Sequence, residues 1–133
     1  MALQITKRLR EGIHVLELKG RLVAGDEVTT FRTAIEEACA EEKPKIIACL
    51  RDVDYVDSTG LGAMVMASTQ LKRTGGALRL MNVNRRNIEL LVLTKLDTMF
   101  EIYTDETDAV NSYFPGREIR KFDILSFVQG MKS

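Results

Sequence analysis

The apolar run Ile46-Ile47-Ala48-Cys49-Leu50 and the hexapeptide Asp57-Ser58-Thr59-Gly60-Leu61-Gly62, separated from it by six residues, decide the fold. The run is short and continuous, which is typical of a strand buried on both faces and parallel to its neighbours. After the hexapeptide, small and apolar residues recur at three- and four-residue steps, as on the inner face of a helix: Leu61, Met64, Val65, Ser68 and Leu71. The sequence therefore predicts a buried strand followed by an amphipathic helix, with Ser58 near the N-cap.

The predicted start of this helix is suited to an anion. The first backbone N–H groups of a helix have no partners within it, and the helix dipole places partial positive charge there. A phosphate would be accommodated, and Gly60 and Gly62 leave room for another chain or a nucleotide. Each glycine costs the helix about 1 kcal/mol relative to alanine, which a purely structural helix start would hardly need twice. The alternative is that Asp57 or Ser58 is an ordinary cap and the glycines carry no function.

This order of segments resembles the STAS domain of bacterial anti-sigma-factor antagonists. The resemblance rests on the hexapeptide, on the buried strand before it, and on Lys72-Arg73-Thr74-Gly75-Gly76 with a second strand after it. It covers about residues 3–114. In that family the serine directly after the aspartate, which corresponds to Ser58, is phosphorylated by a partner kinase that is also the anti-sigma factor. The resemblance therefore implies that Ser58 is a phosphorylation site.

A second match to the family is Gly20-Arg21-Leu22, which is similar to its Gly-x-Leu motif. The family usually has an aspartate next, close to the phosphorylation site, whereas this chain has Val23-Ala24-Gly25 before it reaches Asp26. Whether Asp26 takes over that role is left open. The expected partner-binding surface comprises Asp57, Thr59, Gly60, Leu61, Gly62 and Asp26. Thr59 is expected to be a poorer phosphate acceptor than Ser58, because its hydroxyl can satisfy backbone groups at the helix start.

The remaining pattern predicts an α/β fold of the STAS type, with a mixed, mostly parallel sheet of four to five strands, about four helices and an opening β-hairpin. Glycine, proline and changes in apolar period mark the ends of the elements. Strands are expected over residues 3–10, 13–19, 46–51, 77–83 and 100–103. Helices are expected over residues 26–42, 58–74, 88–96 and 105–113. We expect residues 1–115 to form the STAS domain.

Residues 116–133 form an extension outside the family resemblance. Its apolar residues recur at helical spacing and predict a helix over 122–131 with one broad apolar side: Ile119, Phe122, Ile124, Leu125, Phe127, Val128 and Met131. Such a face rarely stays in water, so we expect it to pack on its own domain. Covering a surface of a partner or of a homodimer mate is the weaker alternative. If it covered the partner site, the extension would be an internal competitor.

Composition bounds the possible functions. The 133 residues contain 19 basic and 19 acidic side chains, which removes the overall attraction to nucleic acid or anionic membranes. No apolar run approaches the ~20 residues that a membrane span requires, and the start of the chain carries Lys7, Arg8 and Arg10 rather than a secretory apolar segment. Cys39 and Cys49 lack C-x-x-C spacing and are predicted to be reduced core residues. We therefore expect a cytoplasmic, soluble protein.

Catalytic constellations are not recognisable in this sequence. His14 is the only histidine, so no Ser-His-Asp set is expected at Ser58, and no metal-ligand cluster or Gly-x-x-x-x-Gly-Lys phosphate loop is present. Gly60-Leu61-Gly62 is followed by Val65 where a dinucleotide fingerprint has a small residue. We expect no catalytic residue, no metal and no cofactor. A small nucleotide-binding protein is a minor alternative, which titration with ATP or GTP would test.

The sequence thus favours a phosphorylation-controlled protein-binding switch, an anti-sigma-factor antagonist that sequesters an anti-sigma factor and serine kinase while Ser58 is unmodified. The family resemblance implies that a protein phosphatase resets it. The alternative is a constitutive STAS adaptor or scaffold subunit, for example one associated with a transporter, that is never phosphorylated. The sequence does not identify the sigma factor or the pathway.

Overall fold

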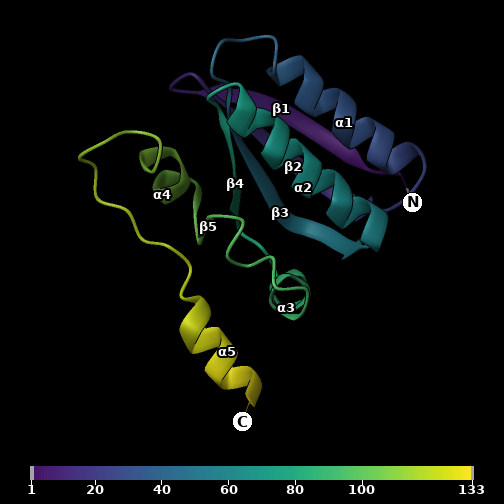
Figure 1. Ribbon diagram of the computed structural model, residues 1–133, viewed down its shortest axis with the longest axis vertical. Coiled ribbons are helices and arrows are strands. Elements are labelled where there is room, and N and C mark those ends of the chain that lie inside the picture. Colours follow the sequence, from purple (N-terminus) through teal and green to yellow (C-terminus); the bar gives the residue numbers. More distant parts are fainter. Residues whose placement is uncertain (1, 133) are drawn as a thin grey trace.

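A five-stranded mixed sheet forms the centre of the computed structural model, which describes residues 2–132 (Figure 1). The strands lie in chain order: β1 (Gln4–Arg10), β2 (Ile13–Leu22), β3 (Lys45–Val56), β4 (Ala77–Met81) and β5 (Ile102–Tyr103). β1 and β2 form an antiparallel hairpin, and the other neighbours are parallel. The predicted α/β class, the mostly parallel sheet and the opening hairpin are confirmed.

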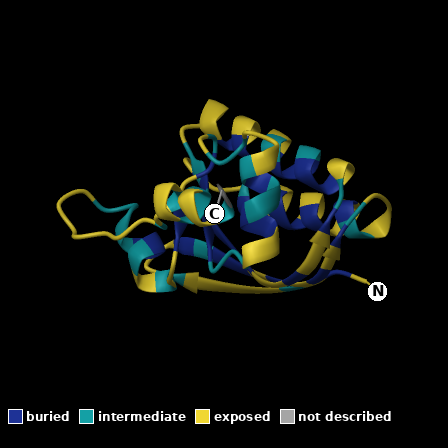
Figure 2. Cartoon of the chain, turned by 90° about the horizontal axis from the view of Figure 1, so that it is seen from below, coloured by how far each residue is buried: buried dark blue, intermediate teal, exposed yellow. Residues whose placement is uncertain are grey.

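Two helices, α1 (Asp26–Ala38) and α2 (Ser58–Arg73), lie side by side on one face of this sheet (Figure 1). α3 (Arg85–Leu93) adds its apolar side chains to the same core. Because the inner residues of α1 and α2 are apolar at helical spacing, they fill the space above β2 and β3. Figure 2 shows the buried residues gathered between these helices and the sheet.

The short helix α4 (Glu106–Asn111) covers part of the opposite face. The apolar run from Ile46 to Leu50 divides between the two cores, with Ile46, Ala48 and Leu50 on one face and Ile47 and Cys49 on the other. Every residue of the run is less than a tenth exposed. The continuous apolar pattern therefore reflects a strand covered on both sides, as predicted.

β3 is longer than the predicted strand. Its additional residues carry the chain to the end of the sheet at which β2 also ends. Beyond Leu50 it stays paired with β2 as far as Val56, across two register shifts. The side-chain amides of Asn84 and Asn87 donate to the Val53 carbonyl at 2.9 and 3.0 Å, which ties this part of β3 to the start of α3. This part of β3 was not predicted, because its charged residues interrupt the apolar run that indicated the strand.

Other predicted elements also end earlier than expected, among them α3 at Leu93 and α4 at Asn111. α1 stops at Ala38 rather than near residue 42, and the connection to β3 contains Lys43 with φ 52° before Pro44. β4 ends at Met81, since Asn82 also has positive φ. β5 keeps only two residues of its predicted range.

The C-terminal extension contains a fifth helix within the described residues, α5 (Ile124–Lys132). Before it, the Phe122 N–H donates to the Ile102 carbonyl at 2.9 Å, and Lys121 bridges to Tyr103, so the chain lines the outer side of β5. Phe122, Ile124 and Phe127 pack against the core. Leu125, by contrast, is 70 % exposed, so one side of the expected broad apolar face is left in water. Figure 1 shows α5 projecting beyond the sheet.

An ion-pair network joins α4 to the opening hairpin. Arg8 and Arg10 both hydrogen-bond the Glu106 carboxylate, with Nη1–Oε2 distances of 2.8 Å. The bonds from Arg8, and then those from Arg10, lower the pKa of Glu106 from 4.5 to about 2. A carboxylate with a depressed pKa stabilises the fold above its unfolded-state pKa and loses that contribution as the pH falls.

The Glu106→Gln variant is therefore expected to be less stable than wild type at neutral pH. The difference in free energy of unfolding should shrink as the pH falls from 4.5 to about 2. Urea unfolding at several pH values measures this, with Glu42→Gln, at an exposed carboxylate, as the control. Equal pH profiles for wild type and Glu106→Gln would contradict the assignment.

Candidate functional site

The candidate site lies where β3 ends and α2 begins. Asp57 is the N-cap of α2, and its Oδ1 accepts the Gly60 N–H at 2.7 Å. Its Oδ2 accepts the Ala24 N–H at 3.0 Å, and its own N–H donates to the Leu22 carbonyl at 3.2 Å. The N–H groups of Ala24 and then of Gly60 hold the pKa of Asp57 below its usual value. Asp57 therefore joins the helix start to the connection that follows β2.

Ser58 is the first residue of α2 and is exposed. Because Asp57 provides the cap, the Ser58 hydroxyl is not needed to satisfy the helix, and within residues 2–132 it has no hydrogen-bond partner. Thr59 is exposed beside it. The predicted position of Ser58, at the start of a helix directly after a buried strand, is confirmed.

The two glycines of the hexapeptide have different surroundings. A Cβ on Gly60 would lie 2.1 Å from the Leu22 carbonyl oxygen, so this glycine lets α2 approach the backbone of β2 closely. A Cβ on Gly62 would have nothing within 4 Å. The expectation that both glycines leave room for a partner is therefore wrong for Gly60, which is buried, and remains a proposal for Gly62.

Leu61 is also inside the protein. It is 9 % exposed and belongs to the main core, where it lines a small hollow with Leu50 and Met64. The expectation that Leu61 helps to form an exposed docking surface is wrong, because the first turn of α2 points this side chain at the sheet. The exposed part of the hexapeptide consists of Ser58 and Thr59, with Asp57 and Gly62 partly exposed.

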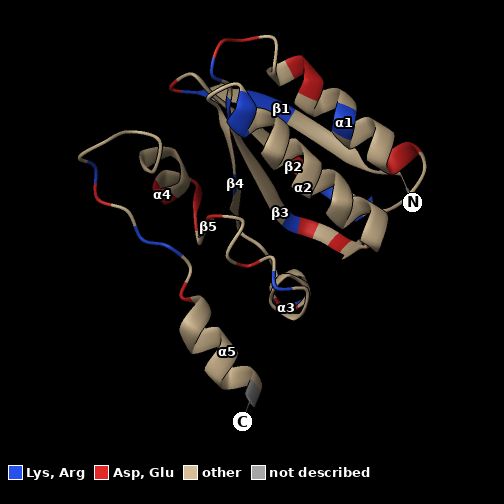
Figure 3. Cartoon of the chain, viewed as in Figure 1, with Lys and Arg blue, Asp and Glu red and all other residues tan. Residues whose placement is uncertain are grey.

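Asp26 is the first residue of α1 and is exposed. α1 and α2 both begin at the edge where β2 and β3 end, so Asp26 and Ser58 lie at the same edge of the sheet (Figures 1 and 3). No hydrogen bond joins Asp26 to the hexapeptide among the described residues. At the position where the family motif has aspartate stands Val23, which is half-buried, followed by the Ala24 N–H on Asp57.

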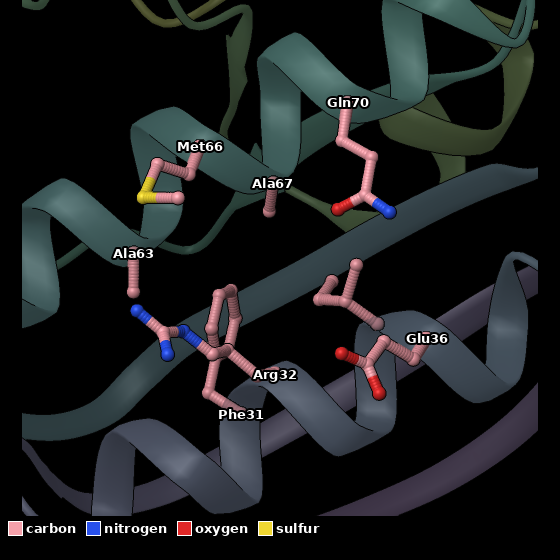
Figure 4. A pocket seen from close by; sticks show the side chains of 8 residues that line it. Phe31, Arg32, Glu36, Ala63, Met66, Ala67 and Gln70 are labelled. Carbon is pink, nitrogen blue, oxygen red and sulfur yellow. The ribbon is translucent and has the colours of Figure 1, made fainter.

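Sequence reasoning missed a groove that begins one turn further along α2. Ser58, Gly62, Met66 and Gln70 follow at steps of four and form one ridge of the helix. Beyond Gly62 this ridge borders a hollow of about 230 Å³ between α1 and α2 (Figure 4). Phe31, Ala63 and Ala67 are among its lining residues, while Met66 stands at its rim and is 62 % exposed. The available signal was a methionine on the polar side of the helix.

His14 lies at the opposite end of β2 from this site, where its Nε2 is 3.0 Å from Glu41 Oε1. It pairs across the sheet with Ile46, at the start of β3, whereas Ser58 follows the end of β3. The only histidine is therefore not a base for Ser58. The described residues contain no group of His, Cys, Asp and Glu side chains that could hold a metal ion.

Family membership follows from a match between a protein-family model and most of the chain. The family model described as STAS domain matches residues 4–109. The chain belongs to the STAS domain family. The match contains β1 to β5 and the candidate site, and it ends within α4, so α5 lies outside it.

Two curated relatives of this STAS protein are anti-sigma factor antagonists. The anti-sigma-B factor antagonist of Bacillus subtilis (strain 168) is 41 % identical over 63 residues, which cover 47 % of this chain and 58 % of the relative. The chain thus spans little more than half the length of that relative. The anti-sigma F factor antagonist of Paenibacillus polymyxa is 27 % identical over 113 residues, covering 83 % of this chain and 94 % of the relative.

Solved structures show the same fold. An anti-sigma factor antagonist from Mycobacterium paratuberculosis matches with a TM-score of 0.73 at 20 % identity, covering 84 % of this chain and 93 % of that one. A sulfate transporter family protein from Wolinella succinogenes matches with a TM-score of 0.64 at 20 % identity, covering 92 % and 93 %. Across residues 2–132 of this STAS protein, no helix has the length and apolar character needed to span a membrane.

Proposed function

We propose that this STAS protein is an anti-sigma-factor antagonist that works as a phosphorylation-controlled binding switch. With Ser58 unmodified, it sequesters an anti-sigma factor that is also a serine kinase. Phosphorylation of Ser58 releases that partner, and a protein phosphatase restores the binding form. The observation that carries this proposal is the exposed Ser58 hydroxyl at the first residue of α2, next to an aspartate that already caps the helix.

Phosphorylation of Ser58 leaves the fold intact in this proposal. The side chain is exposed, and both carboxylate oxygens of Asp57 keep their backbone N–H partners whether or not Ser58 is modified. The phosphate adds about −1.5 to −2 charges at neutral pH. Those charges sit beside Asp57 on a surface that the partner must cover, so repulsion and steric exclusion act on binding rather than on folding.

The proposed docking surface consists of Ser58, Thr59, Gly62 and Met66 on α2, with Asp26 at the start of α1. Gly62 leaves the backbone of α2 open to close approach, and Met66 offers an exposed apolar side chain beside the groove. Gly60 and Leu61 support this surface from inside. The partner kinase supplies the base, Mg²⁺ and ATP, and Ser58 supplies the acceptor oxygen. In this proposal the STAS protein is therefore a non-catalytic binding protein that needs no cofactor. We also propose that it acts in the cytoplasm.

The proposal is tested by incubating the protein with its candidate kinase and ATP. Mass spectrometry should locate the phosphate on Ser58, and the phosphorylated protein should lose affinity for the kinase. The Ser58→Ala variant should take up no phosphate and still bind. Phosphate found mainly on Thr59, or equal binding of both forms, would overturn the proposal.

Replacing Met66 with glutamate is expected to weaken kinase binding about 10-fold, because a charge would enter the apolar part of the contact. Isothermal titration calorimetry measures the change. Leu9→Glu is the matched control, since Leu9 is 64 % exposed, close to the 62 % of Met66, but lies at the opposite edge of the sheet. Equal affinities for both variants would place the groove outside the contact.

The C-terminal extension lies outside this docking surface in our proposal, because Phe122 and Phe127 pack on the core. The guanidinium of Arg85 on α3 also lies 5.6 Å from the Phe127 ring centre. Deletion of residues 117–133 should then lower the free energy of unfolding and leave kinase affinity unchanged. Raised affinity would instead identify an internal competitor, and conversion of a dimer to a monomer would identify a homodimer contact through α5.

A constitutive adaptor is the second candidate, favoured by the likeness to the sulfate transporter family protein. In that case the hexapeptide is a docking edge that is never modified. Co-purification with a transporter ATPase from cells, with no phosphate on Ser58, would support the adaptor and contradict the switch.

A further inference from the structure

Two arginines converge on one tyrosine at the same edge of the sheet as Ser58. Arg21 on β2 and Tyr55 on β3 are paired neighbours in the sheet, and the Arg21 guanidinium carbon lies 5.5 Å from the Tyr55 ring centre. The Arg86 guanidinium carbon, from α3, lies 5.6 Å from the same ring centre. The Tyr55 side chain is 40 % exposed. Three elements of the fold thus place two positive charges on one accessible ring.

Neither of these two charges forms an ion pair among the described residues. Among the described residues, neither Arg21 nor Arg86 has a carboxylate within ion-pair distance, and Arg86 reaches only the backbone carbonyl of Asp54, at 3.4 Å. Five other arginines do have a glutamate carboxylate within ion-pair distance: Arg8, Arg10, Arg79, Arg85 and Arg117. A ring face attracts a guanidinium less strongly than a phosphate does, so the pair is held but remains available to an anion.

The cluster lies at the same end of β2 and β3 as the proposed phosphorylation site. Arg21 precedes Leu22, whose carbonyl accepts the Asp57 N–H, and Tyr55 stands two residues before Asp57. The pKa of Asp57 is lowered mainly by the Ala24 and Gly60 N–H groups, and the charge of Arg21 adds to this. Arg21 therefore already acts on the residue that precedes Ser58.

A phosphate on Ser58 needs such a cation. The donors expected to receive it at the helix start are engaged, because the Gly60 N–H bonds Asp57 Oδ1 and the Leu61 N–H bonds the Asp57 carbonyl at 2.9 Å. The new dianion would also lie beside the Asp57 carboxylate. Without a nearby cation, the phosphate would meet repulsion from Asp57 and few free N–H groups.

We propose that Arg21, supported by Arg86, is an internal receiver for the phosphoryl group on Ser58. This inference rests on the proposed function of Ser58. On phosphorylation, the Arg21 guanidinium leaves the Tyr55 ring and forms paired N–H···O bonds with the phosphate, and Arg86 remains on the ring and adds its charge. The receiver fixes the phosphate against the domain and gives the released form a defined structure.

The test uses protein that carries phosphoserine at position 58 from translation, so no kinase is needed. A ³¹P NMR titration gives the second pKa of the phosphate, which is about 6 for a free phosphoserine. In wild type this pKa should be lowered by roughly 0.5 to 1 unit, and Arg21→Gln should abolish most of that shift. Arg86→Gln should abolish a smaller part. Arg73→Gln, the same change at the other end of α2, is the matched control.

An unchanged phosphate pKa in Arg21→Gln, with the native fold confirmed by circular dichroism, overturns the receiver. If Arg21→Gln instead weakens kinase binding by the unmodified protein and leaves the phosphate pKa unchanged, the cluster binds an acidic group of the partner, and the receiver is again wrong. These results are separate from a failure of the switch itself, which would show as a kinase that does not modify Ser58. The phosphoserine protein reports on the receiver in either case.

Discussion

Gly60→Ala is expected to lower the free energy of unfolding by about 3 kcal/mol, the upper end of the cost of overpacking a core. The added Cβ would lie 2.1 Å from the Leu22 carbonyl oxygen and 2.8 Å from its carbonyl carbon. These are backbone atoms of β2, so no side-chain rotation relieves the contact, and α2 must move away from the sheet. Urea unfolding followed by circular dichroism measures the loss.

Gly62→Ala is the matched control for this prediction. The substitution is the same, two residues along the same helix, but its Cβ would have nothing within 4 Å. Because alanine favours the helix over glycine, Gly62→Ala should be neutral or stabilising by up to about 1 kcal/mol. Similar losses for both variants would show that α2 does not approach β2 as closely as described.

Ser58→Asp is expected to reduce affinity for the partner kinase roughly 100-fold, because a second carboxylate beside Asp57 would be buried against the partner's own charges. The fold should survive, since Ser58 is exposed and the Asp57 cap is untouched. Titration calorimetry with the purified kinase measures the affinity, and thermal unfolding verifies the fold.

Thr69→Asp is the matched control for charge alone. Thr69 is an exposed hydroxyl residue on the same helix, eleven positions further along, and its replacement likewise exchanges a hydroxyl for a carboxylate. It should leave the affinity within a few-fold of wild type, as is usual for surface changes outside an interface core. Equal losses for both variants would mean that the effect is a general response to acidic charge, and the role of Ser58 as the switch would be rejected.

The sequence predicted those elements whose burial is visible in the spacing of apolar residues within the element itself. The run from Ile46 to Leu50 is apolar at every position because β3 is covered on both faces there, and the apolar stripe of α2 follows from its contact with the sheet. The position of Ser58 at the start of a helix follows from those two facts. None of this required long-range information.

The features that the sequence could not predict depend on contacts between distant segments. The second half of β3 is held by pairing with β2 and by Asn84 and Asn87, so its charged residues show no strand pattern. Gly60 looks like Gly62 in sequence, and only the proximity of Leu22 separates a packing glycine from an open one. The stacking of Arg21 and Arg86 on Tyr55 likewise joins three elements that are far apart in the chain.

The backbone of residues 121–122 on β5 has a consequence for self-association. Bonded to Ile102 and bridged to Tyr103, this segment occupies the hydrogen-bonding groups that β5 would otherwise offer to a foreign strand. The other border of the sheet is β1, where the charged side chains of Lys7, Arg8 and Arg10 oppose strand addition. Neither border therefore readily accepts a foreign strand, which disfavours edge-to-edge association between copies of this chain.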